Sequence, residues 1–482
     1  MLKIKLLTFA LVAFTFVTQA KTNLDYLPSD AQWREHANYI AKYYLHPDAK
    51  GVPEGNFPTW RCDDGTLRNQ KLCPFERDVG EMIKITGIDW IRMQSRQTFA
   101  YGVFYQLTGN SEALRLHKAG VNFLLTKGLD PEGGFHSLME KGEPLTWPVE
   151  TGFTDSRLAR TSQDLSYALV GLAMNAYLTH DPKVIKVIMD TQKYIYDTYY
   201  DKDKGFLRWN FVDTYFDKKD QVELVAMLDQ LNAYLLMVWR LVPEVSRPEW
   251  TATIRKTIDD MNKNFYDNPT NHFWGCTHNK SCYDQNNGRH QDYGHRVKAF
   301  WMEYIAALGL GDSKLANFAK KGMLDTLKLA STRNNNDWYG DNLQRGADYW
   351  HYAELDQSAL TLALSDDFDM ADTLRPWINE YTDKEYGDLK NWSFKSFYWR
   401  NGFHNSEHSL IGTILSNAIR AKQCSDAKCK SKNSTYLYFA PVDDKDRNFT
   451  PYYYSGKIVK TEKTKDGLKV FFEDIDLPKK VK

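Results

Sequence analysis

The feature that most constrains the fold of this chain is an alternation of short and long connections between helical patterns. The short connections, such as His180-Asp181-Pro182, end one helix and cap the next. The long connections carry a glycine beside an aromatic residue: Gly55-Asn56-Phe57, Gly133-Gly134-Phe135, Gly205-Phe206, Phe273-Trp274-Gly275, Trp338-Tyr339-Gly340 and Gly402-Phe403. Because short and long connections alternate, all the long loops are expected on one rim of the fold.

Apolar residues at i, i+3 and i+4 spacing predict about a dozen helices. They cover about residues 32–44, 89–108, 112–127, 163–179, 183–199, 222–241, 248–265, 295–310, 314–331, 349–364, 369–382 and 406–421. Corresponding helix starts recur every 50 to 75 residues or so, roughly the size of a helical hairpin with one generous loop. Six hairpins that close on themselves form an (α/α)6 toroid, the all-α fold that we predict. An open solenoid is the alternative, although its repeats are normally shorter and more uniform.

In this toroid the inner helices begin near residues 89, 163, 222, 295, 349 and 406. Their N-terminal ends then share a mouth with the long loops. After about residue 430 the pattern changes, and residues 434–439, 457–461 and 468–472 predict short strands. We therefore divide the chain into a signal peptide (1–20), a helical barrel (21–430) and a β-rich extension (431–482) that packs on it.

The first 20 residues predict a secretory signal peptide. Lys3 and Lys5 precede an apolar run, and Thr18-Gln19-Ala20 suits cleavage after Ala20. The apolar run is too short to span a bilayer comfortably, and no later stretch approaches twenty apolar residues. The mature protein is expected to be soluble and exported, either periplasmic or secreted.

The cysteines support export because they fall into close pairs, which predict local disulfides in an oxidising compartment. The pairs are Cys62 with Cys73, Cys276 with Cys282, and Cys424 with Cys429. A zinc site is the alternative for the second pair, since His272, His278 and His290 lie close in sequence. Their spacing matches no specific zinc framework, so a disulfide is favoured and no metal or cofactor is predicted.

Charge excludes some classes of partner. The 62 Lys and Arg residues balance 62 Asp and Glu residues, and no basic block stands out. Nothing therefore indicates nucleic acid or a membrane surface as partner once the signal peptide is removed. Aromatic residues are abundant, with 14 Trp and 29 Tyr, and those on the rim suit stacking against sugar rings. The oligomeric state is left open.

Two histidines are expected at the mouth. His295 opens one inner helix, and His404 lies just before another, about 110 residues further on. Histidine titrates near neutral pH, so a pair on opposite sides of a substrate can exchange protons with a carbon next to a carbonyl. Each residue alone could simply bond to backbone at a helix start. Their shared placement after glycine-bearing loops favours a joint role.

Asp292-Tyr293-Gly294-His295, with Trp301 six residues on, resembles the Gly-His motif of the N-acylglucosamine 2-epimerase family. This family of (α/α)6 sugar epimerases and aldose-ketose isomerases includes cellobiose 2-epimerases and mannose isomerases. Other matches, from about residue 91 to residue 421, follow in the family's order. They are Gln94 to Tyr101 with its arginine, Asp130 to Phe135, Tyr349 to Glu354, and Trp399 to His404.

The resemblance implies that His295 and His404 are the acid/base pair and that Arg96 reaches the sugar oxygens. Glu354 would orient a catalytic group or bind a hydroxyl. The other substrate-binding candidates are Trp350, Tyr101 and Asp229. Removing the C2 proton of an open-chain aldose leaves negative charge on O1, which a fixed guanidinium would stabilise. The expected function is a carbohydrate 2-epimerase or aldose-ketose isomerase acting on a mono- or oligosaccharide.

The chain departs from the family's pattern at three helices. Lys298 stands where a glutamate is common, one turn after His295, and its charge would lower the pKa of the imidazole. Leu169 replaces a histidine that many members have. Asp229 and Asn232 stand where a histidine and a glutamate are usual. Because the expected pocket differs from the family's at these positions, the substrate of a named member cannot be assumed for this chain.

Other functions remain open. A secreted (α/α)6 glycoside hydrolase needs two carboxylates across a glycosidic bond, and the candidates are Asp164, Asp229, Glu354 and Asp356. A polysaccharide lyase would use the same histidines and Arg96. A non-catalytic glycan-binding protein is the third alternative, with Lys298 as the argument for it.

Overall fold

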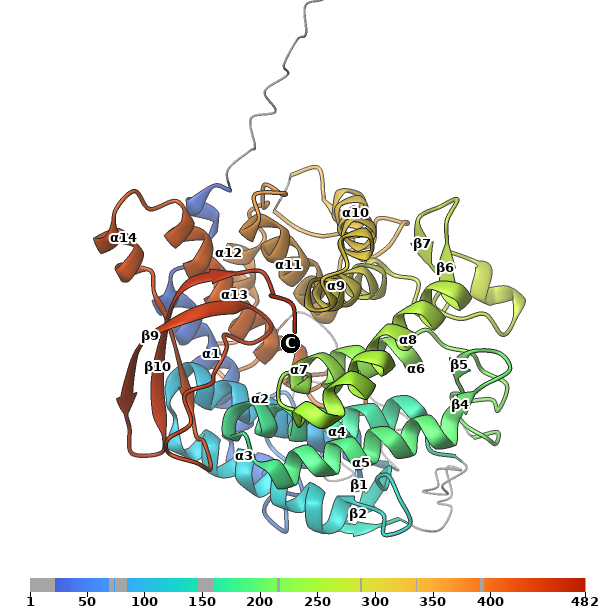
Figure 1. Cartoon of the computed structure of the whole chain (residues 1–482). Coiled ribbons are helices and arrows are strands. Elements are labelled where there is room, and N and C mark those ends of the chain that lie inside the picture. Colours follow the sequence, from blue (N-terminus) through green and yellow to red (C-terminus); the bar gives the residue numbers. More distant parts are fainter. Residues whose placement is uncertain are drawn as a thin grey trace, which may run out of the picture.

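The computed structural model describes residues 22–68, 73, 85–145, 159–214, 217–286, 288–334, 336–390 and 394–481. The predicted signal peptide lies outside these residues. The described part of the chain is rich in helices and carries small antiparallel sheets (Figure 1).

An inner set of helices follows the long loops. It consists of α2 (Ile91–Thr108), α4 (Ser162–Thr179), α6 (Val225–Gln230), α9 (Tyr293–Leu310), α11 (Tyr349–Leu364) and α13 (Phe403–Lys422). α2 packs on α4, α4 on α6, α9 on α11, α11 on α13, and α13 on α2. Between α6 and α9, the carboxylate of Asp229 lies 3.0 Å from the Nζ of Lys298. Contacts between the inner helices therefore run around a complete circuit (Figure 1).

An outer set alternates with the inner one along the chain. It consists of α1 (Asp30–Tyr44), α3 (Ser111–Phe123), α5 (Pro182–Tyr199), α8 (Arg247–Phe265), α10 (Ser313–Ala330) and α12 (Leu374–Pro376). The outer helix α5 buries only one face, through residues such as Val184, Ile188 and Ile195. The inner helix α4 is buried on every side. A helix buried all round must lie inside, whereas an amphipathic helix covers a core.

The predicted helix boundaries agree with the structure to within two residues, except at four helices. The helix predicted at residues 112–127 ends at Phe123 and continues as a π-helical segment, Leu124–Gly128, and the helix predicted from residue 406 begins at Phe403. The third inner helix begins at Val225 instead of residue 222, and it continues through a π-helical segment, Leu231–Leu235, into α7 (Leu236–Val238). The last outer helix begins at Leu374 instead of residue 369 and continues as a π-helical segment, Trp377–Tyr381. The hydroxyl of Thr373 donates to buried Asp356 at 2.6 Å, which fixes the residue before this helix.

The long loops contain strands that the sequence did not predict. The sheet β1-β2-β3 is formed by Ile88–Trp90, Leu138–Glu140 and Glu143–Pro144; β4 (Tyr200–Asp201) pairs with β5 (Phe206–Leu207), and β6 (Tyr266–Asp267) with β7 (His272–Phe273). Glycine is required in one of these loops. A Cβ on Gly134 would lie 2.7 Å from the ring of Tyr194, and its φ is +71°. The glycine-aromatic signature therefore marks tight turns against the outer helices.

The C-terminal extension contains the three predicted strands. After the short helix α14 (Ala427–Lys432), β8 (Thr435–Phe439), β9 (Ser455–Lys463) and β10 (Leu468–Asp476) form an antiparallel sheet in the order β8-β10-β9. The backbone N–H of Ala440 donates to the carbonyl of Leu178 at 3.0 Å, and that of Val481 to Gly309 at 2.8 Å. The extension thus covers the C-terminal ends of α4 and α9.

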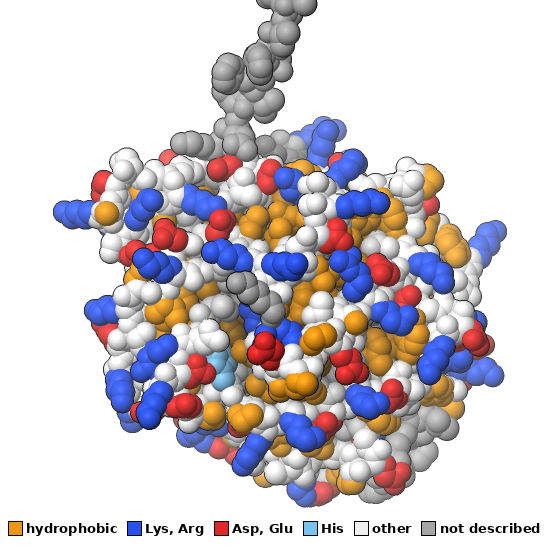
Figure 2. All heavy atoms as spheres, viewed as in Figure 1, with side chains coloured by type: hydrophobic (Ala, Val, Ile, Leu, Met, Phe, Trp, Pro, Cys, Tyr) orange, Lys and Arg blue, Asp and Glu red, His pale blue; other side chains and the backbone are white. Residues whose placement is uncertain are grey.

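Each predicted cysteine pair is a disulfide in the structure. The Cα atoms are 5.5 Å apart for Cys62–Cys73, 5.0 Å for Cys276–Cys282 and 5.5 Å for Cys424–Cys429. On the face shown in Figure 2, Lys and Arg side chains are interspersed with Asp and Glu. Within the described residues, every helix is too short or too polar to cross a membrane.

Candidate active site

His295 lies in the first turn of α9 and is held by the residue that caps this helix. The carboxylate of Asp292 accepts hydrogen bonds from the backbone N–H of His295 at 2.8 Å and from its ring Nδ1 at 2.7 Å. Nε2 of His351 lies 3.2 Å from the same carboxylate, while its Nδ1 accepts from the backbone of Asp348 at 3.0 Å. Asp292 therefore favours the His295 tautomer with a proton on Nδ1, which leaves Nε2 free to accept one.

The charges of this pair suit a general base. Burial lowers the pKa of His295, and the Asp292 carboxylate offsets this only in part. Burial alone would raise the pKa of Asp292, but His295 and His351 hold it well below its usual value. At neutral pH a neutral imidazole therefore lies beside an ionised carboxylate.

His404 lies in the first turn of α13, whereas the sequence had placed it just before the helix. Its Nδ1 is 3.3 Å from Oε1 of Glu354. This is a close electrostatic contact and not a hydrogen bond, because neither carboxyl oxygen of Glu354 has a hydrogen-bond partner among the described residues. Burial, followed by the charges of Lys298 and Arg96, holds the pKa of His404 well below its usual range. His404 is therefore also neutral at physiological pH.

Trp350 brings the two histidines together. Its ring centroid lies 4.5 Å from that of His295 and 6.1 Å from that of His404. A charge on His295 also lowers the pKa of His404. Two histidines from distant parts of the chain thus meet at one indole, at the N-terminal ends of their helices.

Arg96 lies close to the second histidine. Its guanidinium packs 3.8 Å from the ring centroid of Tyr167 and 5.7 Å from that of Phe403, the residue before His404. Its Nη1 donates to the carbonyl of Trp399 at 3.1 Å. Among the described residues, no carboxylate lies within ion-pair distance of Arg96. A buried guanidinium held by rings and a carbonyl keeps its charge available for a developing oxyanion.

Two of the departures from the family's pattern are paired with each other. Nζ of Lys298 lies 3.0 Å from Oδ1 of Asp229 and 3.8 Å from Oε1 of Glu354. Asp229 also accepts hydrogen bonds from Tyr167 at 3.0 Å and from Gln163 at 2.7 Å. Lys298 and Asp229 therefore neutralise each other inside the ring of helices. A buried charge left alone would be costly, so each of these two residues depends on the other.

The predicted effect of Lys298 on His295 is small. Its charge does lower the pKa of His295, but burial is the largest cause and Asp292 acts more strongly. Lys298 itself has a raised pKa, since Asp229, Tyr167 and Glu354 outweigh its burial. It remains a cation in the site.

Tyr101 does not join the other predicted residues. It is completely buried, its hydroxyl donates to the carbonyl of Tyr44, and it accepts a hydrogen bond from Gln97 at 3.0 Å. Tyr101 is five positions after Arg96, and this spacing turns their side chains roughly 140° apart on a helix. Arg96 faces the histidines, and Tyr101 faces the outer helix α1.

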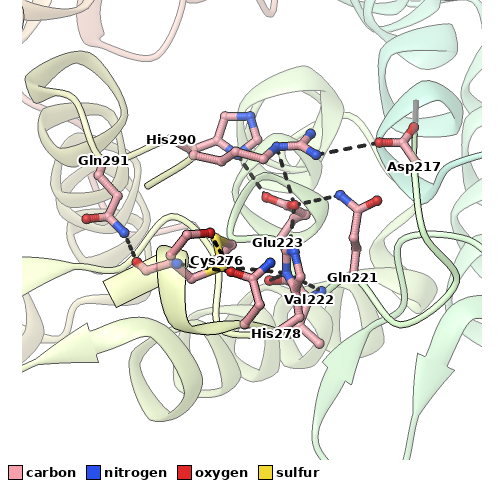
Figure 3. The surroundings of a disulfide bond; sticks show 12 residues. Asp217, Gln221, Val222, Glu223, Cys276, His278, His290 and Gln291 are labelled. Carbon is pink, nitrogen blue, oxygen red and sulfur yellow. Dashed lines mark hydrogen bonds and ion pairs between the residues drawn. A yellow bond between two sulfur atoms is a disulfide. The ribbon is translucent and has the colours of Figure 1, made fainter. Parts of the chain in front are cut away.

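The loop that leads into His295 is anchored to a buried carboxylate (Figure 3). Glu223 accepts a hydrogen bond from Gln221 at 2.9 Å and contacts Nδ1 of His290 at 3.0 Å and Nε of Arg289 at 3.5 Å. The ring centroid of His290 lies 4.7 Å from that of His295. Glu223 thus supports His295 through His290.

The same loop contains the residues that the zinc alternative would need. One ligand atom from each of Cys276, His278 and Cys282 lies within 4.8 Å of the others. The two sulfur atoms are joined in a disulfide, so they are not thiolates that could bind a metal. In this state the loop is closed by a covalent bond.

Sequence reasoning missed several contacts of the candidate site. An aspartate three residues before His295 has the spacing of a helix cap, so the role of Asp292 could have been inferred. His351, by contrast, reaches Asp292 from another helix, and nothing local predicts that. The same is true of Glu223 and His290, which meet only in the folded chain.

Comparisons with known proteins support the architecture. No family profile matches the chain, and no curated protein matches it in sequence. The solved structure of cellobiose 2-epimerase from Spirochaeta thermophila is similar with a TM-score of 0.61 at 15% identity, covering 81% of this chain and 98% of that one. A D-mannose isomerase gives 0.61 at 13% identity, covering 80% and 97%.

A family 76 glycoside hydrolase from a bovine Bacteroides thetaiotaomicron strain is also similar, with a TM-score of 0.51 at 10% identity, covering 81% of this chain and 78% of that one. At these identities the likeness shows the fold alone. The resemblance inferred from the motifs is confirmed at that level: the chain has the fold of solved sugar epimerases and isomerases.

Proposed function

We propose that this protein is an exported (α/α)6 sugar 2-epimerase or aldose-ketose isomerase that transfers a proton at C2 of a reducing sugar. The observation that carries the proposal is the meeting of half-buried His295 and buried His404, both neutral, at the indole of Trp350. The circuit of inner helices supports the toroid. The disulfides support an oxidising compartment.

The proposed reaction begins on the open-chain sugar. One imidazole removes the C2 proton, and the C1 carbonyl becomes an enediolate whose charge lies on O1. Arg96 is the cation that would stabilise this oxygen. In an epimerase the second imidazole takes up a proton from solvent and delivers it to the opposite face of C2, while the first releases the C2 proton to solvent. In an isomerase the first imidazole delivers its proton to C1, and the proton of the O2 hydroxyl moves to O1, which gives a ketose.

The carboxylates of the hydrolase alternative have other partners. Asp164 forms an ion pair with Arg92 at 2.8 Å, and Asp229 forms one with Lys298. Asp356 accepts hydrogen bonds from Trp338, Thr373 and His408. Of these four candidates, Glu354 is the one whose carboxyl oxygens have no hydrogen-bond partner among the described residues, whereas hydrolysis of a glycoside needs two working carboxyl groups.

The proposal is tested by incubating the protein with a panel of aldoses and disaccharides in heavy water, followed by proton NMR. Epimerisation or isomerisation with deuterium at C2 is the expected result. Cleavage of a disaccharide would favour a hydrolase, and an unsaturated product that absorbs in the near ultraviolet would favour a lyase. Binding without any turnover across the panel would contradict the enzymatic proposal.

A further inference from the structure

The loop between β7 and α9 brings sulfur, imidazole and carboxylate groups together (Figure 3). Cys276 and Cys282 are 1% and 0% exposed. Nδ1 of His278 lies 3.7 Å from Sγ of Cys282, and one ligand atom from each of these three residues lies within 4.8 Å of the others. Oε1 of Glu223, a completely buried carboxylate, lies 3.9 Å from the same nitrogen. Four groups that can bind a metal are therefore neighbours.

Backbone contacts hold these groups in place from separate segments of the chain. Glu223 and Cys276 form an antiparallel β-bridge, so the segment before α6 lies alongside the loop. The N–H of Cys282 donates to the side chain of Asn279 at 3.3 Å. Neither contact uses a sulfur atom. The arrangement therefore does not depend on the S–S bond alone.

The distance between sulfur and nitrogen is the one that zinc requires. Zn²⁺ binds a thiolate at about 2.3 Å and an imidazole at about 2.0 Å in tetrahedral sites, which places the two ligand atoms roughly 3.6 Å apart. Sγ of Cys282 and Nδ1 of His278 are 3.7 Å apart. The N–H of Val222 is nearer to this nitrogen than its carbonyl is, at 3.2 Å against 3.4 Å, which favours the tautomer with a lone pair on Nδ1. A metal would replace that N–H.

Glu223 suits the fourth position of such a site. Its carboxylate accepts a hydrogen bond from Gln221 at 2.9 Å and lies 3.0 Å from Nδ1 of His290. Carboxylates that bind metals are typically held by hydrogen bonds of this kind. Two thiolates and one carboxylate carry one negative charge more than Zn²⁺ neutralises. The Arg289 guanidinium, 3.5 Å from Glu223, offsets this charge.

We propose that this loop is a redox-gated zinc site: when the Cys276–Cys282 bond is open, both thiolates, Nδ1 of His278 and the carboxylate of Glu223 bind one Zn²⁺. The chain is synthesised with thiols, so the ligands are present before the disulfide forms. Afterwards a dithiol reductant restores them; it gives two electrons and two protons to the S–S bond and becomes a disulfide itself. Zinc then displaces the two thiol protons to solvent. The inference does not rest on the proposed function.

The first measurement is zinc binding to the full-length protein before and after reduction by a phosphine, with mass spectrometry to show which cysteine pairs are open. The reduced protein should bind one Zn²⁺ with a Kd of about 1 nM or tighter, and the oxidised protein at least about 10³-fold more weakly. Co²⁺ in place of zinc should give a thiolate-to-cobalt charge-transfer band. A reduced protein without this site would overturn the proposal, and so would a pair that the phosphine cannot open in the folded chain.

A second cysteine pair gives a matched control. Cys276→Ser/Cys282→Ser should abolish tight zinc binding, whereas Cys424→Ser/Cys429→Ser should keep it. In the reduced wild type, zinc should slow the alkylation of Cys276 and Cys282 and leave that of Cys424 and Cys429 unchanged. Equal effects on the two pairs would mean that zinc binds reduced cysteines without selecting this loop, and would contradict the site.

The other two ligands are tested separately. His278→Ala should weaken zinc binding to the reduced protein by at least about 100-fold. His180→Ala is its control, because both imidazoles are 14% exposed and His180 pairs with Asp446 at the other end of the fold. Glu223→Gln should weaken binding about tenfold. Unchanged affinity in His278→Ala would overturn the proposal, and unchanged affinity in Glu223→Gln would contradict the carboxylate as fourth ligand.

Discussion

At the scale of residues, the site consists of a few polar side chains whose charge and orientation each depend on a neighbour. Asp292 orients His295, Glu354 contacts His404, and Asp229 neutralises Lys298. The sequence identified both histidines from their place after glycine-bearing loops. It did not show that the charge reversal at Lys298 is balanced, because Asp229 belongs to another helix.

His295→Ala and His404→Ala should each lower kcat by about 10²-fold or more, because either change removes a proton-transfer partner. The measurement is turnover on the substrate found in the heavy-water panel, with circular dichroism to show that the fold is kept. His36→Ala, in a buried structural histidine that bonds to Thr382 and Trp377, should lower stability instead of chemistry. Near-normal turnover in either variant would contradict a proton-transfer role for that histidine.

Asp292→Asn should reduce kcat by about 10²-fold or more, since an amide no longer fixes the Nδ1–H tautomer of His295. The pH dependence of kcat/KM gives a second readout. Without the carboxylate, the pKa of His295 falls further, so the acidic limb should move to lower pH. A matched control is Asp341→Asn, whose carboxylate pairs with Arg345 on an exposed loop. An unchanged acidic limb in Asp292→Asn would contradict the orienting role.

Lys298→Met should destabilise the protein by about 3 to 5 kcal/mol, because it leaves the buried carboxylate of Asp229 without its counter-charge. The double variant Lys298→Met/Asp229→Asn should recover most of this loss, as measured by urea unfolding. The lysine has a raised pKa and the aspartate a lowered one, so the pair is intact from about pH 4 to about pH 10. Without Lys298, burial raises the pKa of Asp229, so the difference between single and double variants should shrink as the pH falls through this raised pKa. Additive losses would show that the two substitutions are independent.

At the scale of elements, a long loop contacts the candidate site. The Cys276–Cys282 disulfide closes the loop that carries His290 to the ring of His295. The sequence predicted this bridge from spacing and compartment. It could not predict the strands within the loops, because two-residue strands depend on the partner that the fold supplies.

Removing the Cys276–Cys282 bridge with two serines should lower stability by about 2 kcal/mol and also lower kcat, because His290 and Glu223 lose their anchor beside His295. Removing Cys424–Cys429, which spans a similar separation of 5 residues against 6, should cost a similar stability without a change in kcat. Thermal unfolding and kinetics on the paired variants test this. Equal effects on kcat would mean that the rim loop does not support the site.

At the scale of the whole molecule, the inner helices meet around a circuit and bring residues from α2, α9, α11 and α13 to one end of it. The C-terminal extension covers the opposite end of this ring of helices and places the side chain of Tyr452 inside the ring. From the sequence, this tail was expected only to pack on the barrel. Its strands were predicted correctly, but residues 449–454 carry no periodic pattern that would show where their side chains lie.

The sequence by itself determined the helices, the alternation of loops, the disulfides and the candidate histidines, because each can be recognised from residues close together in the chain. Only the tertiary structure decided which side chains meet. Lys298 pairs with Asp229 across the ring of inner helices, and Tyr452 donates to Glu407 from the C-terminal extension. Such contacts depend on packing between distant segments, and local spacing carries no information about them.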